Sequence, residues 1–268
     1  TIFGVFIGTV SATMSRRLAH MEVNIMDLDE LSGHTVIFGW NRAGPTVLGE
    51  LFAGSPRDTA VVLVTERDDL VPELPATGIR PELLYRVTGD YTRVEVLHKV
   101  NIKEAATAIL LADAQLPRSD QDRDARTVLA ALTIEKLHPA IFTVAELTNR
   151  QNEQLLKLAH VEEIVVADEY GATIIGSASR NHGLVSIVDE ILTSRYGNSF
   201  RKVTVTEPWA NKPISEVYPA LKLQLDAILV ALVRAEDGVE GEVVVNPPLD
   251  AVVRLGDRLV VLSATSIR

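Results

Sequence analysis

The chain has 268 residues, of which 47% are hydrophobic and 23% are charged, and its formal net charge is −10 at pH 7. This composition is typical of a folded globular protein and excludes a largely disordered chain. Because the sequence contains no cysteine, it excludes disulfide bonds, thiolate metal sites and cysteine nucleophiles. The acidic balance disfavours nucleic-acid binding; an acidic surface either concentrates cations or simply keeps the domain soluble.

The N-terminal run at residues 1–14, TIFGVFIGTVSATM, carries no charge. A membrane-spanning helix needs about 20 apolar residues, so this run is too short to cross a bilayer by itself. Arg16 and Arg17 follow it directly, as basic residues do on the cytoplasmic side of a membrane. We therefore expect residues 1–18 to be the end of a truncated transmembrane helix, with a buried soluble helix as the alternative. Residues 19–32 are expected to be a linker.

Strand-like and helix-like segments alternate from residue 33 onward. Continuous apolar strands separated by helices predict a parallel sheet covered on both faces. Six such strands predict an α/β, Rossmann-like, doubly wound domain over residues 33–168, with its clearest helix at residues 124–137. The predicted strands lie at residues 34–38, 60–65, 83–88, 107–112, 140–145 and 163–167.

The pattern changes after the sixth strand. Two helical segments with an apolar face predict a helical crossover over residues 169–200. Short β segments separated by Pro and Gly then predict a smaller α+β lobe over residues 201–268. Asp237 and Gly238 lie between two of these segments and indicate a hairpin.

The loop after the first predicted strand reads GWNRAG at residues 39–44. A dinucleotide-binding loop has glycine at the third place, where the backbone must approach a pyrophosphate, and this chain has Asn41 there. Glu66 follows the second strand, where a ribose-binding acid stands. Asn41 therefore weakens the case for an adenine-nucleotide site that binds NAD, ADP or ATP. A purely structural loop is the alternative. The residues of this candidate site are Gly39, Asn41, Gly44, Glu66, Arg67 and Asp90.

Catalytic motifs are missing from the sequence. None of the six histidines has a recognisable catalytic spacing, and there is no nucleophile elbow, Walker loop or His-Glu-x-x-His motif. The sequence therefore disfavours a nicotinamide-dependent oxidoreductase and predicts no catalytic residue.

Several motifs together resemble a known family. They follow the apolar helix end at residues 1–18 and are VIFGWNRAG (36–44), VTERDD (64–69), VTGDYTR (87–93), NPP (246–248) and LGDRL (255–259). Together they resemble the RCK domain (regulator of K⁺ conductance, TrkA-N and TrkA-C type) of ligand-gated potassium channels. Residues 119–132 and the run VAELTNRQNEQLL also resemble plant CASTOR and POLLUX channels. We therefore expect a bacterial relative of those channels.

The RCK resemblance implies a gating function and no enzyme activity. It implies a homo-oligomer: a tetrameric channel for K⁺ with a ring of eight such domains on the cytoplasmic side of the cell membrane. Residues 1–18 then end the pore-lining helix, and the crossover at residues 169–200 joins neighbouring subunits; burial within one subunit is the alternative. A ligand moves such a gate only if it binds the open and closed rings with different affinity. A regulatory subunit of a Trk/Ktr-type transporter is the alternative function.

Ca²⁺ is the favoured ligand. It prefers several oxygen ligands, and acidic residues follow four successive predicted strands, whose ends share one edge of the sheet. In the calcium-gated archaeal channel of the family, acids after the fourth and fifth strands form a site, and Asp113 and Glu146 match them. The second glutamate expected after the fifth strand is replaced by Thr148. Asp90 has an alternative role as a cap of the following helix. The candidate metal ligands are Asp113, Glu146, Asp90 and Glu66.

Overall fold

The computed structural model describes residues 28–54, 58–67, 69, 78–236 and 239–264. The predicted transmembrane segment at residues 1–18 and most of the predicted linker lie outside these residues, as does the predicted hairpin turn at Asp237 and Gly238. Within the described ranges, no helix is both long enough and apolar enough to cross a membrane. The chain forms two compact units, one up to Thr173 and one from Ile174 onward.

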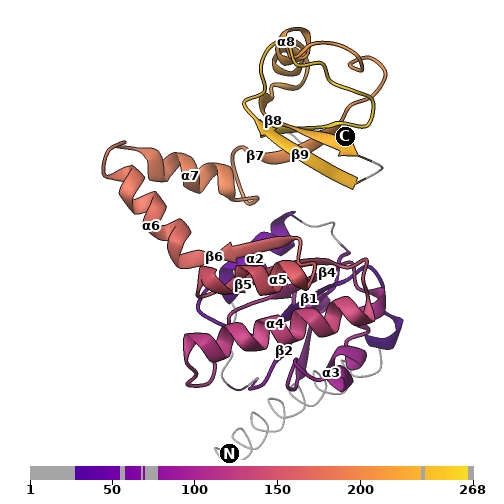
Figure 1. Ribbon diagram of the computed structural model, residues 1–268, viewed down its shortest axis with the longest axis vertical. Helices are drawn as coiled ribbons and strands as arrows, with labels where there is room; N and C mark the ends of the chain where they lie inside the picture. Colours follow the sequence, from indigo (N-terminus) through magenta and orange to yellow (C-terminus); the bar gives the residue numbers. More distant parts are fainter. Residues whose placement is uncertain (1–27, 55–57, 68, 70–77, 237–238, 265–268) are drawn as a thin grey trace, which may run out of the picture. The chain divides into compact units, whose positions relative to one another are not determined.

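The first unit is built on a six-stranded parallel sheet with the order β3-β2-β1-β4-β5-β6 (Figure 1). This order places β1 and β4 side by side in the middle, although β2 and β3 lie between them in the sequence. The predicted Rossmann-like, doubly wound fold is thereby confirmed. The strands are β1 (Thr35–Phe38), β2 (Val61–Thr65), β3 (Leu84–Thr88), β4 (Thr107–Leu110), β5 (Phe142–Leu147) and β6 (Glu163–Val166).

Helices cover both faces of this sheet because side chains alternate along each strand. Ile37 of β1 points to the face that α2 covers, whereas its neighbours Val36 and Phe38 point to the opposite face, which carries α3, α4 and α5. All three side chains are completely buried. The helices are α2 (Gly44–Gly54), α3 (Val94–Lys99), α4 (Asp120–Leu137) and α5 (Glu153–Leu158), with short 3₁₀ turns η1 (Leu28–Glu30), η3 (Pro81–Leu83), η4 (Ile102–Glu104) and η5 (Arg150–Asn152).

Helix α4 begins at Asp120, four residues before the predicted helix. The Ser119 hydroxyl oxygen accepts a hydrogen bond from the Asp122 amide, 3.2 Å away, which caps the helix. Asp120 and Asp122 lie in the first turn, where the helix dipole favours negative charge. The acidic run is therefore the start of a helix.

The second unit contains a four-stranded antiparallel sheet with the order β7-β10-β8-β9. Helix α8 packs Ile214, Val217 and Leu221 into its core. The smaller lobe is α+β as predicted, but the position of α8 was not predicted, because Pro219 interrupts its helical pattern. The elements are α6 (Ala167–Ala178), which begins in the first unit, α7 (Leu184–Leu192), β7 (Ser199–Thr204), α8 (Ile214–Leu225), β8 (Ile228–Glu236), β9 (Val239–Val245) and β10 (Arg258–Ser263).

The LGDRL motif has a structural role in the second unit. Asp257 is 1% exposed and accepts hydrogen bonds from the Arg254 amide at 2.8 Å, the Ala235 amide at 3.1 Å and the Arg234 guanidinium at 2.8 Å. Burial alone raises the pKa of Asp257, but these hydrogen bonds and the Arg234 charge hold it below its ordinary value. Asp257 thus ties β8 to the turn before β10.

Candidate functional site

The candidate site lies at the carboxyl edge of the parallel sheet. The strand order reverses between β1 and β4, and in open α/β sheets ligands bind beyond the carboxyl ends of the strands at such a point. The residues that follow β1, β2, β3, β4 and β5 all belong to this edge. They include every residue that the sequence analysis singled out for nucleotide or metal binding except Glu146, which lies in β5 next to its last residue.

The two glycines of the loop after β1 allow close packing. Gly39 has a φ of +80°, and a Cβ there lies 2.8 Å from the Leu111 carbonyl oxygen. A Cβ on Gly44 lies 2.6 Å from the ring of Trp40, which is 3% exposed. Neither position tolerates a side chain in this backbone, because real Cβ contacts are not that short. The glycines therefore serve the loop's own packing against β4 and Trp40.

Asn41 connects the end of β1 to the end of β5. Its Nδ2 donates to Glu146 Oε2 at 2.7 Å and to the Ala112 carbonyl oxygen at 3.1 Å. Its Oδ1 accepts from the Ala43 amide at 2.9 Å, and Glu146 Oε2 also accepts from the Ala112 amide at 3.0 Å. A side chain and a carboxylate thus lie at the loop where a pyrophosphate needs bare backbone. The loop as it stands does not fit a dinucleotide.

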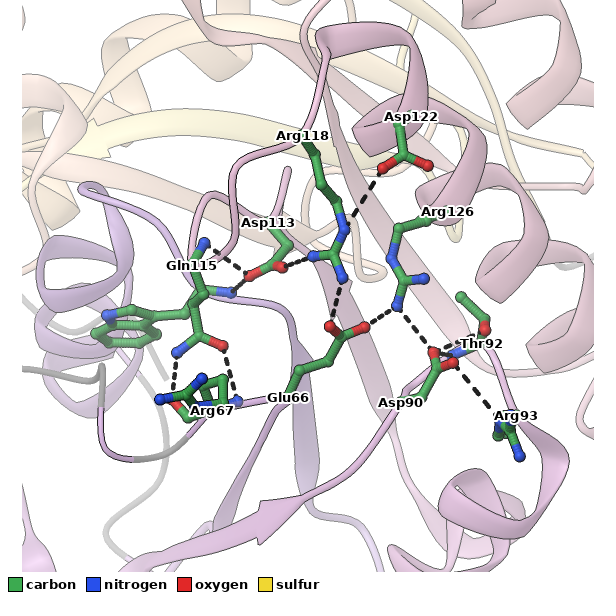
Figure 2. Close-up of polar contacts among 11 residues, drawn as sticks. Glu66, Arg67, Asp90, Thr92, Arg93, Asp113, Gln115, Arg118, Asp122 and Arg126 are labelled. Atoms are coloured by element: carbon green, nitrogen blue, oxygen red, sulfur yellow. Dashed lines mark hydrogen bonds and ion pairs between the residues drawn. The ribbon is translucent and has the colours of Figure 1, made fainter.

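Three of the four candidate acids surround two arginines, as Figure 2 shows. Arg118 forms ion pairs with Glu66 and with Asp113, the latter at 2.6 Å. Arg126 forms ion pairs with Glu66 and with Asp90, the latter at 2.8 Å. We call these five residues the arginine–carboxylate cluster. It joins the ends of β2, β3 and β4 to α4 and to the loop that precedes it.

The acids of the cluster are also held by backbone and hydroxyl groups. Asp113 is 1% exposed, and its Oδ1 accepts from the Trp40 amide at 3.1 Å. Asp90 Oδ1 accepts from the amide and the hydroxyl of Thr92, at 3.1 and 2.7 Å. Burial raises the pKa of Asp90, but the bonds from Thr92 and Arg126 hold it below its ordinary value. Arg93 is the N-cap residue of α3, so Asp90 closes the preceding turn and does not cap that helix.

Tyr91 lies beneath the cluster. Its side chain is completely buried, and the Arg126 guanidinium carbon lies 5.1 Å from the centre of its ring. Burial, followed by the negative charge of Asp113, raises the pKa of Tyr91 to about 12, so the hydroxyl stays neutral at physiological pH. This hydroxyl is near Asp113 and Arg118, and its contact with Arg126 offsets part of the rise in its pKa.

The remaining candidate residues lie around the cluster. Arg67 is exposed and pairs with Asp69 at 2.7 Å, and its carbonyl oxygen accepts from Gln115 Nε2 at 2.7 Å. Glu146 bonds to Asn41 and is not part of the cluster. Within the described ranges, no three acidic or histidine side chains lie close enough together to hold a metal ion as they stand. A cation at this edge therefore needs the acidic side chains to move closer together.

Thr148, where the family pattern leads one to expect a second glutamate, has another partner. Its amide and hydroxyl both donate to Asp124 Oδ1, each at 2.8 Å. Asp124 is 1% exposed, and its Oδ2 accepts from the Asn149 amide at 3.0 Å and from Asn152 Nδ2 at 2.7 Å. A glutamate at position 148 brings a second carboxylate against this buried one. The residues after β5 thus bind Asp124 and fix α4 to this end of the sheet.

The strand order and the flanking helices define a Rossmann-like domain. Residues 35–167 match the family model of the TrkA-N domain, and this part of the chain belongs to that family. The matched curated relatives are ion channels and not enzymes. The chain is 25% identical over 187 residues to the calcium-gated potassium channel TvoK of Thermoplasma volcanium, covering 68% of this chain and 51% of TvoK.

The plant relatives match as well. The chain is 30% identical over 204 residues to the ion channel CASTOR of Lotus japonicus, covering 71% of this chain and 23% of CASTOR. The gating ring of human SLO3 has the same fold over 87% of this chain and 44% of its own, with a TM-score of 0.64 and 14% identity. The chain spans about half of TvoK, and 28% of the ion channel POLLUX of Lotus japonicus.

Proposed function

We propose that this chain is the ligand-sensing part of the gating ring of a potassium channel, and that its ligand is Ca²⁺. The similarity to TvoK, a calcium-gated potassium channel, supports this proposal. On this proposal residues 33–168 are the sensing lobe, residues 169–200 the crossover and residues 201–268 the second lobe. Residues 1–18 end the pore-lining helix, which attaches this cytoplasmic part to the cell membrane.

The single observation that carries the proposal is the collection of carboxylates at the carboxyl edge. Glu66, Asp90 and Asp113 come from the ends of β2, β3 and β4 and meet around two arginines. Their oxygens are the ligand type that Ca²⁺ prefers. When bound, Ca²⁺ supplies two positive charges that neutralise these acids. On this proposal Asp113 and Glu66 would hold the cation, with Asp90 as a third acid, once these side chains lie closer together than they do here.

The nucleotide alternative has less support. Asn41 lies in the loop after β1 and bonds to Glu146, where a pyrophosphate needs bare backbone. A regulatory subunit of a transporter would share this fold, so the fold does not separate the two functions. A K⁺ channel activity of the whole protein would favour the channel over the transporter subunit.

The helix pair α6–α7 supports assembly into a ring. No residue of either helix is buried, and their exposed apolar side chains include Ile175, Ile187 and Leu192, at 73%, 59% and 64% exposure. Monomeric proteins rarely leave such a run of large apolar side chains in water. We propose that this surface contacts neighbouring copies of the chain in a tetrameric channel with eight sensing domains.

Calorimetric titration with Ca²⁺ tests the proposed ligand. Wild type should bind saturably, and Glu66→Gln and Asp113→Asn should each weaken binding at least about tenfold, which corresponds to about 1.4 kcal/mol. Glu216→Gln, which removes an exposed acid on α8, is the charge-matched control and should bind as wild type does. Absence of heat up to millimolar Ca²⁺ contradicts the proposal. Saturable binding of NAD, ADP or ATP instead favours the nucleotide alternative.

A further inference from the structure

We propose that Asn101 is a clamp that holds the end of the linker to the sensing lobe, and that α3 couples this clamp to the loop after β3 at the carboxyl edge. The part of the predicted linker that the structure describes is residues 28–32, directly before Gly33 and β1. Transmission to a pore rests on the proposed function, in which the linker joins this lobe to the pore-lining helix. The clamp itself depends neither on that function nor on the ligand.

Asn101 uses both hydrogens of its side-chain amide on the linker. Its Nδ2 donates to the Asp29 carbonyl oxygen at 3.1 Å and to the Leu31 carbonyl oxygen at 3.0 Å. Both acceptors are carbonyl oxygens, so only the nitrogen of the amide can make these contacts. The backbone of Asn101 is left-handed, with a φ of +47°, a conformation that glycine, asparagine and aspartate adopt at low cost. Of these three residue types, only asparagine has a side chain that donates hydrogen bonds, so it fits the clamp.

Two further contacts fix the end of the linker at the amino edge of the sheet, where β1 begins. The Gly33 amide donates to the Glu104 carbonyl oxygen at 2.7 Å. Leu28 is 5% exposed and belongs to the same apolar core as Leu97 of α3 and Ile102 of η4. The end of the linker is therefore attached to the segment from α3 to η4 by hydrogen bonds and by burial in a shared core.

Helix α3 lies on the way from the carboxyl edge to the amino edge. The strands β3 and β4 belong to one parallel sheet, so the chain between them must return from the carboxyl end of β3 to the amino end of β4. This return consists of α3 and η4. Val100, the C-cap residue of α3, accepts a hydrogen bond at its carbonyl oxygen from His34 Nε2 at 2.9 Å, and both residues are buried. The end of α3 is thus fixed to the residue that precedes β1.

The start of α3 is fixed to the loop after β3. Asp90 Oδ1 accepts from the amide and the hydroxyl of Thr92, at 3.1 and 2.7 Å, which closes the turn before the helix (Figure 2). A Cβ added at Gly89 lies 2.8 Å from Val96 Cγ2, so the loop and the helix are in close contact. Close-packed interiors transmit a displacement because they contain little free space. A shift of the Asp90 turn therefore moves α3, and with it Asn101.

Hydrogen exchange of the full chain, followed by mass spectrometry without added ligand, tests the clamp. Asn101→Gly allows the left-handed backbone and removes the side-chain amide, so exchange of residues 28–34 should become about tenfold faster. Asn101→Asp keeps the shape of the side chain but its carboxylate cannot donate, so its effect should be at least as large. Asn211→Gly is the matched control, because Asn211 is an exposed asparagine with a φ of +61° in the second unit. It should leave exchange of residues 28–34 unchanged.

The same measurement tests the coupling through α3. Asp90→Ala removes the acceptor for Thr92 and should speed exchange of residues 28–34 at least about threefold. Asp90→Asn keeps an oxygen acceptor at this place and should have a smaller effect. Because coupling between two sites is reciprocal, Asn101→Gly should also speed exchange of residues 90–93. Strand β10 is the internal reference and should exchange as it does in wild type.

The outcomes separate the clamp from the coupling. Exchange of residues 28–34 within about twofold of wild type in Asn101→Gly contradicts the clamp. Faster exchange there, without a response to Asp90→Ala and without a change at residues 90–93, contradicts the coupling. Equal acceleration in β10 indicates general loosening and contradicts both. Unfolding curves establish that each variant is folded, and Asn101→Asp carries the test if Asn101→Gly is not.

These results are also independent of calcium sensing. Ca²⁺ is absent from the exchange measurement, so a failure of the clamp leaves the proposed ligand intact. If wild type does not bind Ca²⁺ in the calorimetric titration, calcium sensing is wrong, and the exchange rates still decide the clamp.

Discussion

Asp124→Ala is expected to lower the free energy of unfolding by about 3 to 5 kcal/mol. The Asp124 carboxyl group accepts four hydrogen bonds from three residues, and it is 1% exposed. Alanine leaves the amides of Thr148 and Asn149 and the side chain of Asn152 without this acceptor, and each unsatisfied donor costs about 1 to 3 kcal/mol where water cannot reach it. Urea unfolding followed by circular dichroism measures the loss.

A graded series makes this prediction specific. Thr148→Val removes one donor and should cost only about 1 kcal/mol. Asp122→Ala, in the same helix but with a side chain 53% exposed, should change stability by less than about 0.5 kcal/mol. A loss below about 1 kcal/mol for Asp124→Ala would show that the β5 end does not hold α4 in the way described.

Gly39→Ala is expected to lower the free energy of unfolding by about 2 to 4 kcal/mol. The positive φ of +80° is unfavourable for any residue with a Cβ, and that Cβ meets the backbone oxygen of Leu111 at 2.8 Å. The Leu111 backbone, directly after β4, cannot move away cheaply, because its amide donates a hydrogen bond to the Phe38 carbonyl oxygen of β1 at 2.9 Å. The midpoint of urea unfolding measures the effect.

Gly49 provides a control of opposite sign. It lies inside α2 with nothing within 4 Å of an added Cβ. Gly49→Ala should therefore raise stability by about 0.5 to 1 kcal/mol, because alanine restricts the unfolded chain and favours the helix. Equal effects of the two substitutions would contradict the close approach of the β1 loop to β4.

The parallel sheet was predictable because short stretches of sequence indicate each of its strands and helices. Each strand is a short apolar run, and a parallel order requires helices between the runs, so the alternation at residues 33–168 specified the fold class. Helix α8 was missed because its local signal is broken by Pro219 and because strand-like runs on either side dominate the region. Local patterns thus predicted the helices and strands where no proline interrupted the pattern.

The partners in the candidate site were less predictable. The edge rule for parallel strands predicted that Glu66, Asp90 and Asp113 share one edge of the sheet, and there they pair with two arginines. It did not indicate Arg118 or Arg126, because a pairing over 52 or 60 residues depends on the direction in which α4 returns across the sheet. The same holds for the contact between Asn41 and Glu146, 105 residues apart. A weak signal exists in hindsight, since two arginines flank the acidic start of a helix that follows β4.

The most direct test of calcium gating is an electrophysiological recording from the whole protein that contains this chain, with Ca²⁺ applied on the side of the sensing domain. Calcium gating predicts a K⁺ current whose open probability changes with Ca²⁺. In Glu66→Gln the change should need at least about tenfold more Ca²⁺, since a ligand shifts a gate only through its differential affinity for the two states. A K⁺ current that is the same with and without Ca²⁺ in the wild type would contradict calcium gating.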